Sequence, residues 1–94
     1  MEEVITLELN ETKGTFRLWV DGKQAGKMTF VFADSNKIII DHTEVNEKLN
    51  GKGFGKKLVA KGVAFAREKN LKIIPLCPFA KKAFDKTPEF QDVL

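Results

Sequence analysis

The first half of the chain alternates between apolar and polar residues, and turn-forming residues separate the alternating runs. Val4 to Leu9 alternates loosely and Thr15 to Val20 alternates apolar and polar residues, which predicts two strands. Gln24 to Phe32 and Lys37 to Val45 predict two more. Asp21-Gly22 favours a type I′ hairpin turn, because both central positions of that turn need a positive φ. We therefore expect an antiparallel meander of four strands.

Apolar residues recur at helical spacing in the second half. The segment from Gly53 to Asn70 predicts an amphipathic helix with lysines on its polar side, and Asn70 is a plausible helix stop. Leu71 to Cys77 predicts a short strand, and Pro75 within it indicates a sheet edge or a local distortion. Pro78 suits the first turn of a final short helix. A strand, a helix and a strand in this order predict a right-handed parallel crossover.

The predicted fold class is therefore α+β, with the four-strand meander followed by a helix, a parallel fifth strand and a short C-terminal helix. Three isoleucines in succession, at 38–40, are typical of a strand that is covered on both faces. The aromatic residues Phe79, Phe84 and Phe90 are expected to pack the last helix and the tail against the sheet rather than to stack on a bound aromatic ligand. The 94 residues leave room for one domain, which we expect to span 1–94.

A glycine-rich turn, Asn50-Gly51-Lys52-Gly53-Phe54-Gly55-Lys56-Lys57, separates the fourth strand from the helix. Glycine lets the backbone turn tightly and approach another group closely. A helix that begins directly after such a turn directs unpaired N–H groups and the positive end of its dipole at one spot, which suits a phosphate. The alternative is a plain glycine turn with solvated lysines, and the motif by itself leaves both open.

Composition limits the classes of protein to consider. With 43% hydrophobic and 31% charged residues the chain is typical of a globular protein. No apolar run approaches the roughly 20 residues that span a bilayer, and the acidic start Met1-Glu2-Glu3 is not typical of a signal peptide. One cysteine cannot form an internal disulfide, which fits a reducing, cytoplasmic location. One histidine and one cysteine among scattered acids do not make a metal site.

The net charge is +3, and most lysines lie between positions 48 and 86. Such a skew serves either a phosphorylated ligand or nucleic acid, but more often it marks the solvated faces of helices. No alternation of aromatic and basic residues accompanies it, which argues against nucleic-acid binding.

Four short segments together resemble the GNAT superfamily of acetyl-CoA-dependent N-acetyltransferases. They are Ile-Asp-His-Thr-x-Val at 40–45, Gly-x-Gly-x-Gly-Lys-Lys-Leu at 51–58, Cys-Pro-Phe-Ala at 77–80 and Phe-Gln-Asp-Val at 90–93. The size is similar to that of the minimal, single-domain YjdJ-like subfamily. Asn50 stands where the superfamily usually has Gln or Arg, so backbone donors must dominate phosphate binding. The chain also lacks the two helices that full-size members place between their first and second strands, which predicts an open acceptor side.

The resemblance implies an acetyl-CoA site between splayed fourth and fifth strands. Backbone groups of the fourth strand would pair with the pantetheine arm, N–H groups of the glycine turn would hold the pyrophosphate, and nearby lysines would add charge. The residues implied in cofactor binding are Thr43, Glu44, Val45, Asn50, Gly51, Lys52, Gly53, Phe54, Gly55, Lys56 and Lys57.

Three side chains are candidates for catalysis. His42, the only histidine, titrates near neutrality and is a candidate general base, or else a structural residue. Glu44 shares its strand face and is a second candidate base, or a surface acid. Cys77 precedes a helix N-terminus, where a thiol is more reactive. It is a candidate nucleophile or proton donor, or simply a small apolar residue.

The leading hypothesis is an N-acetyltransferase that acts on a primary amine, such as a protein lysine or N-terminus, as a monomer or weak dimer. A coenzyme-A-binding or interaction module with little catalysis is the alternative, and a small nucleic-acid-binding domain is a less favoured third.

Overall fold

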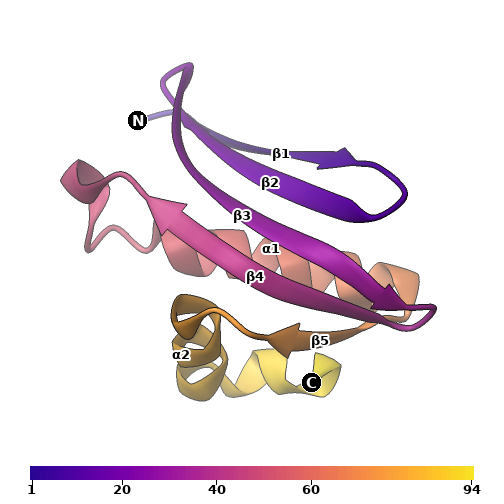
Figure 1. Cartoon of the computed structure of the whole chain (residues 1–94). Helices are drawn as coiled ribbons and strands as arrows, with labels where there is room; N and C mark the ends of the chain where they lie inside the picture. Colours follow the sequence, from indigo (N-terminus) through magenta and orange to yellow (C-terminus); the bar gives the residue numbers. More distant parts are fainter.

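One five-stranded sheet organises the chain in the computed structural model, which describes residues 1–94 (Figure 1). In chain order the elements are β1 (Glu3–Leu9), β2 (Lys13–Val20), β3 (Lys23–Asp34), β4 (Lys37–Val45), η1 (Glu47–Leu49), α1 (Phe54–Lys69), β5 (Lys72–Pro75), α2 (Pro78–Lys86) and η2 (Pro88–Val93). The strand order is β1-β2-β3-β4-β5; the first four strands pair antiparallel and β5 pairs parallel with β4. The predicted meander and parallel fifth strand are confirmed.

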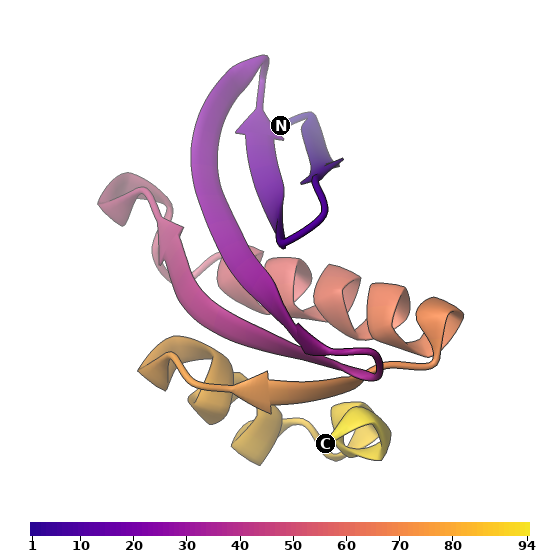
Figure 2. The same cartoon turned by 45° about the vertical axis from the view of Figure 1, so that its right-hand side comes forward.

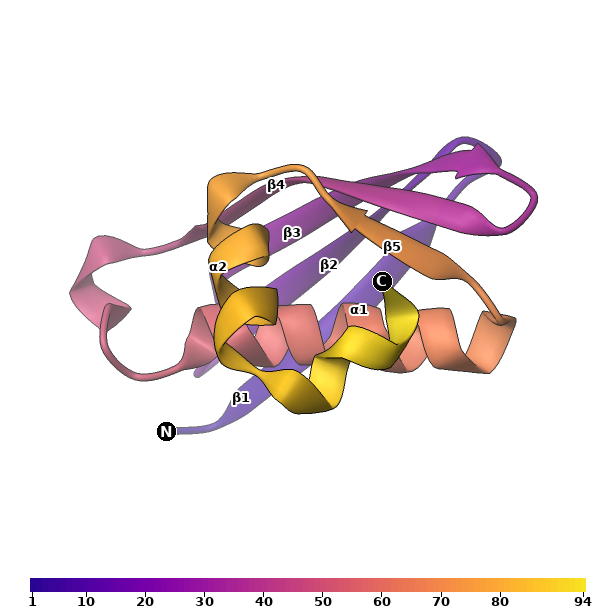
Figure 3. The same cartoon turned by 90° about the horizontal axis from the view of Figure 1, so that it is seen from below.

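The helices cover only one face of the sheet. Seen from below, α1, α2 and η2 all lie on the same side of the strands (Figure 3). Ile38 and Ile40 point into the core beneath these helices and are fully buried, whereas Ile39 faces the other side and is half-buried. The expectation of a fourth strand covered on both faces was therefore wrong, because no helix lies over the second face. None of the helices has the length and apolar run needed to cross a membrane.

Local backbone chemistry sets the ends of several elements. Asp21 and Gly22 take φ values of 50° and 82°, which confirms the predicted type I′ turn between β2 and β3. Asn70 has a φ of 56° and its N–H bonds back to the carbonyls of Ala66 and Arg67, so α1 ends where the sequence predicted.

An extra residue in β4 changes which side chains face the core. His42 lies opposite Thr29, but Ile40 lies opposite the next residue, Phe30, so Asp41 is the extra residue of a β-bulge. Before the bulge the even-numbered residues point inward; after it Thr43 and Val45 are the more buried positions and His42 and Glu44 are exposed. The hydroxyl of Thr29 donates to a carboxylate oxygen of Asp41 over 2.6 Å and spans the bulge.

The pairing of β4 with β5 ends just before this bulge. Only positions 37–40 of β4 pair with β5, and the N–H groups of Leu76 and Cys77 then both bond to the carbonyl of Ile40. The two strands diverge beyond that point (Figure 2). The rest of β4, from Asp41 to Val45, has a neighbour on its β3 side but none on the β5 side.

The C-terminal turn η2 is held to the sheet and to α1 by a small polar cluster. Arg67 donates to both carboxylate oxygens of Asp92, over 2.9 and 2.6 Å, and Lys72 donates to the Asp92 carbonyl over 2.8 Å. The hydrogen bond from Arg67 lowers the pKa of the Asp92 carboxyl, and the same bond raises the pKa of Arg67. Val93 beside this cluster is buried, so the ion pair fixes the last turn over the core.

We expect Asp92→Asn to lower the thermal stability at neutral pH. Because folding lowers the pKa of Asp92, its contribution is present above the unfolded-state pKa and is lost as the pH falls through the folded-state pKa. The melting temperatures of wild type and variant should therefore converge between about pH 5 and about pH 2. Asp85→Asn is the control, since Asp85 on α2 makes no side-chain hydrogen bond in the chain. A gap that stays constant over this range would contradict the prediction.

Candidate functional site

The glycine turn between η1 and α1 adopts a backbone that only glycine takes readily. Gly51 and Gly53 have φ values of 83° and 78°, and Gly53 is the residue directly before the helix. No atom lies within 4 Å of a Cβ built at either position. The need for glycine there is thus conformational and not a matter of space.

Six consecutive N–H groups in this turn bond to nothing within the chain. These are the N–H groups of residues 51–56; the first helical bond of α1 runs from Lys57 N–H to the carbonyl of Gly53, over 3.1 Å. No acidic residue stands in the first turn of α1. Unpaired donors at the positive end of a 16-residue helix form a site for a phosphate group.

A cavity of about 230 Å³ joins this turn to the end of β4. Its lining residues are Val45, Leu49, Asn50, Gly51, Gly53, Phe54, Gly55, Lys56 and Phe79. Phe79 is 46% exposed, and its ring covers Gly55 so closely that a Cβ there would lie 2.1 Å from the ring. The expectation that Phe79 packs against the sheet was wrong, since it packs on α1, whereas Phe84 is buried in the core.

The free edge of β4 presents backbone groups beside the same cavity. The N–H of Asn46 bonds to the carbonyl of Ala25 on β3, over 2.7 Å. Successive residues of a strand direct their backbone groups to alternate sides, so those of Glu44 also face β3. The N–H and C=O groups of Thr43 and Val45 consequently face the open side. Of the three β4 residues expected to pair with the cofactor, these two have backbone groups available for pairing.

His42 and Glu44 lie together on the uncovered face of the sheet. The Nε2 of His42 is 3.4 Å from Oε2 of Glu44, and their side chains are 56% and 57% exposed. The other carboxylate oxygen of Glu44 is 3.8 Å from Nζ of Lys27. Both side chains of the pair are therefore accessible from solvent.

Cys77 lies on the other side of β4 from this pair. Its thiol is buried, caps α2 by accepting the N–H of Ala80 over 3.3 Å, and is 3.4 Å from the hydroxyl of Thr43. Thr43 and Cys77 therefore meet where β4 and β5 diverge. No hydrogen bond joins Cys77 to His42, because the bulge turns Thr43 toward Cys77 and leaves His42 on the other face.

The lysines of the turn have different surroundings. Lys56 lines the cavity, and Lys52 is exposed without an ion-pair partner. Lys57 instead pairs with Glu3 of β1 and lies 5.4 Å above the ring of Phe54, while its N–H is used within the helix. The side chain of Asn50 makes no hydrogen bond within the chain, although the residue lines the cavity.

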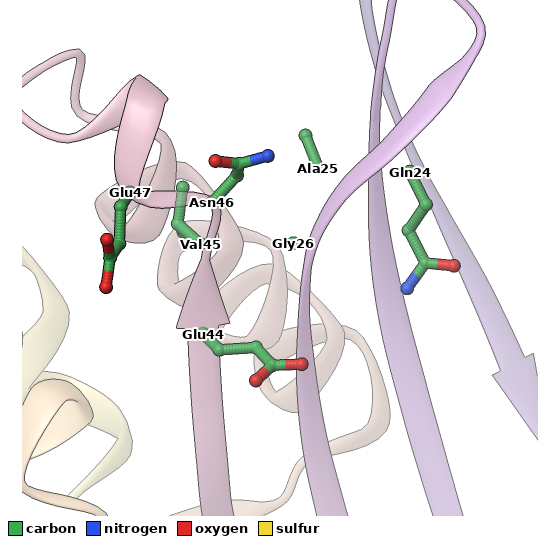
Figure 4. A pocket seen from close by; sticks show the side chains of 7 residues that line it. All are labelled: Gln24, Ala25, Gly26, Glu44, Val45, Asn46 and Glu47. Atoms are coloured by element: carbon green, nitrogen blue, oxygen red, sulfur yellow. The ribbon is translucent and has the colours of Figure 1, made fainter.

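A second hollow, of about 550 Å³, lies at the end of β4 on the β3 side (Figure 4). Gln24, Ala25, Gly26, Glu44, Val45, Asn46 and Glu47 line it. Glu44 extends from β4 toward β3, whereas the side chain of Glu47 points away. Val45 is the one residue that lines both this hollow and the cavity at the glycine turn.

Two features of the site were not predicted from the sequence, the side-chain hydroxyl of Thr43, a residue expected to contribute only its backbone, and the exposed ring of Phe79. The hydroxyl of Thr43 was missed because the bulge that turns it toward Cys77 depends on the pairing with β3. Phe79 was assigned to the core, although it stands at a position of α2 outside the stripe made by Ala80 and Phe84. That spacing was a signal in the sequence for an exposed aromatic side chain.

The comparisons with known proteins agree with this geometry. Residues 15–93 match the family model described as GCN5-related N-acetyl-transferase. A Staphylococcus aureus protein described as GCN5-like is 42% identical, with a TM-score of 0.72 over 94% of this chain and 85% of its own. No curated protein sequence is significantly similar to the chain.

Two more distant structures share the fold. An IAA acetyltransferase from Bacillus cereus ATCC 14579 is 18% identical, with a TM-score of 0.72 over 90% of this chain and 75% of its own. A GNAT family acetyltransferase from Elizabethkingia anophelis, solved with acetyl-CoA bound, is 14% identical, with a TM-score of 0.68 over 76% of this chain and 62% of its own.

A pair of alanine substitutions separates backbone strain from ligand binding. Gly53→Ala and Gly22→Ala both place a side chain in a left-handed conformation with free space around it, which should cost each variant about 1 kcal/mol of unfolding free energy in urea. Only Gly53→Ala alters the turn that carries the unpaired N–H groups, so only it should weaken coenzyme A binding in calorimetry. Equal affinity in both variants would contradict the assignment of the site.

Proposed function

Because the chain belongs to the GCN5-related N-acetyltransferase family, we propose that it transfers the acetyl group of acetyl-CoA to the nitrogen of a primary amine. The observation that carries this proposal is the run of six unpaired N–H groups at the start of α1, directly beside the free edge of β4. An anion site and an unpaired strand edge are what a ligand with a pyrophosphate and an amide-containing arm requires.

The backbone does most of the binding in this proposal. The N–H groups of Gly51 to Lys56 hold the pyrophosphate, with Lys52 and Lys56 adding positive charge and Asn50 at the rim of the cavity. Phe54 contributes its N–H only, because its side chain is buried. The backbone groups of Thr43 and Val45 pair with the pantetheine arm as an added strand would. Val45 belongs to both parts of the site, since it lines the cavity at the glycine turn and its backbone groups lie on the free edge of β4.

The reaction forms a bond from the amine nitrogen to the thioester carbonyl carbon, breaks the carbon–sulfur bond and moves one amine proton to the released thiol. The amine must lose its proton to complete the attack, and a neutral imidazole accepts it well near neutral pH. We assign this role to His42. Glu44, 3.4 Å from its ring nitrogen, holds the ring and stabilises the positive charge that it gains.

Cys77 is assigned to the leaving group. Its thiol lies at the point where β4 and β5 diverge, next to the hydroxyl of Thr43, which fixes the sulfur at this edge. From there it can give its proton to the departing sulfur of coenzyme A and recover one from solvent. In the alternative route Sγ attacks the carbonyl carbon, coenzyme A leaves, and the acetyl group passes from Cys77 to the amine.

The acceptor in this proposal is an amine on an exposed protein segment, either a lysine side chain or an N-terminus. No helix lies over the sheet face that carries His42 and Glu44, and more than half of each side chain is exposed. An open face of this kind gives a small metabolite few contacts, whereas an extended peptide has enough surface to make its own.

Titration of isotope-labelled protein with acetyl-CoA tests the binding mode. Amide signals of residues 51–56, Thr43 and Val45 should shift most, since their N–H groups gain partners. Signals of the β1–β2 turn, 10–12, should remain unchanged and serve as the internal control. A flat response in the glycine turn, or the largest shifts in β1 and β2, would overturn the proposal.

Acetylation of a peptide pool, followed by mass spectrometry, tests the catalytic roles. His42→Ala should lower kcat about 100-fold, as expected for loss of a general base. Glu44→Gln should lower kcat by a smaller factor, while Glu47→Gln, in the adjacent η1, is the matched control and should be neutral. Binding of acetyl-CoA without acetylation by wild type would favour the coenzyme-A-binding module.

The same experiment decides the role of Cys77. If Cys77 is a proton donor, Cys77→Ala should lower kcat. Wild type should then carry no acetyl group when acetyl-CoA is added alone. An acetyl group found on Cys77 of the wild type would replace direct transfer by the covalent route.

A further inference from the structure

An apolar patch lies on the uncovered face of the sheet, at the β5 side. It consists of Val31 on β3, Ile39 on β4, Ile74 on β5 and Leu76 just after β5. Ile39 pairs with Val31 on one side and with Ile74 on the other, so these three side chains form one row across the sheet. Leu76 extends the row along β5, and its N–H bonds to the carbonyl of Ile40 where β4 and β5 diverge.

Nothing in the chain covers this patch. Ile74 is 41% and Leu76 68% exposed, and Val31 and Ile39 are half-buried. Single exposed apolar side chains are common on protein surfaces. Four of them gathered from three neighbouring strands and the end of one instead form a continuous apolar surface, which gains free energy when a ligand covers it.

The patch lies next to the proposed proton acceptor. His42 stands opposite Thr29 on β3, and Ile39 stands opposite Val31, two positions further along the same strand. Two residues of a strand span about 7 Å, and their side chains point to the same face. His42 and the patch therefore occupy adjacent rows of one surface.

The charges on the other side of His42 are those that an amine requires. Glu44 contacts the His42 ring, and Asp41, in the bulge, adds a second exposed carboxylate. Lys27 lies near Glu44, whereas Asp41 forms no ion pair. An amine arrives as a cation, which these carboxylates attract. The acceptor thus meets acidic side chains at one end of the site and apolar surface at the other.

We propose that the apolar patch selects acceptor segments that carry a large apolar side chain one or two positions from the acetylated amine. The inference rests on the proposed function, because His42 determines where the amine is held. An extended segment with its amine at His42 reaches the adjacent row with one of its next side chains. An apolar side chain there covers the patch and gains binding free energy, which a small polar one does not.

Acetylation rates of matched peptides test the proposal. One peptide of each pair has leucine, and the other serine, at the two positions nearest to the amine. One pair offers a lysine and has a blocked N-terminus; the other offers a free N-terminus and has no lysine. For the pair that is acetylated, wild type should show a kcat/KM about tenfold higher with leucine, as expected for burial of part of one apolar side chain.

Variants at exposed positions assign this preference to the patch. Ile74→Thr/Leu76→Gln should remove most of the difference between leucine and serine peptides, because it makes the exposed half of the patch polar. Leu76→Gln alone, at the most exposed position, should remove part of it and gives the reading if the double variant is unstable. Val4→Thr, an equally conservative change on the opposite edge strand β1, should keep the wild-type preference.

The remaining outcomes contradict the inference. Equal wild-type rates for leucine and serine peptides, or a preference that both patch variants retain, would overturn it and leave the proposed function intact. Failure of wild type to acetylate any of the peptides would overturn the proposed function, and this inference with it.

Discussion

One extra residue in β4 determines most of what is particular to this chain. The bulge at Asp41, spanned by the hydroxyl of Thr29, reverses the alternation of side chains along the strand. It leaves His42 exposed on the open face and turns Thr43 toward Cys77. The pairing with β5 also ends next to it, so the strand edge that a ligand can use begins there. A regular β4 would place these groups on the opposite faces.

The elements that depend on local chemistry were predictable from the sequence. Asp21-Gly22 favoured a type I′ turn, and the glycine-rich run predicted a tight turn, in which Gly51 and Gly53 take positive φ values. Apolar periodicity identified the strands and α1, because each such pattern lies within one contiguous segment. The family could also be identified from the sequence, because its motifs are short and contiguous.

What escaped prediction depends on contacts between distant segments. The isoleucines at 38–40 indicated cover on both faces, but whether a helix lies over Ile39 depends on the path of the whole chain. The partner of Lys57 is Glu3, more than fifty positions away in sequence, and nothing in the glycine motif points to it. Phe79 was expected in the core because hydrophobicity alone does not distinguish a side chain on the flank of a helix from one on its inner face.

The order of strands in the sheet is the same as their order along the chain, and this has a consequence for folding. Each of the first three pairings closes a short hairpin, whereas β4 meets β5 only after the whole of α1. Closing a longer loop costs more chain entropy, and non-local pairings form more slowly. We infer that the meander forms first and that the β4–β5 junction, with Cys77 beside it, is completed last. Pulse-labelled hydrogen exchange in which β5 gained protection before the hairpins would contradict this order.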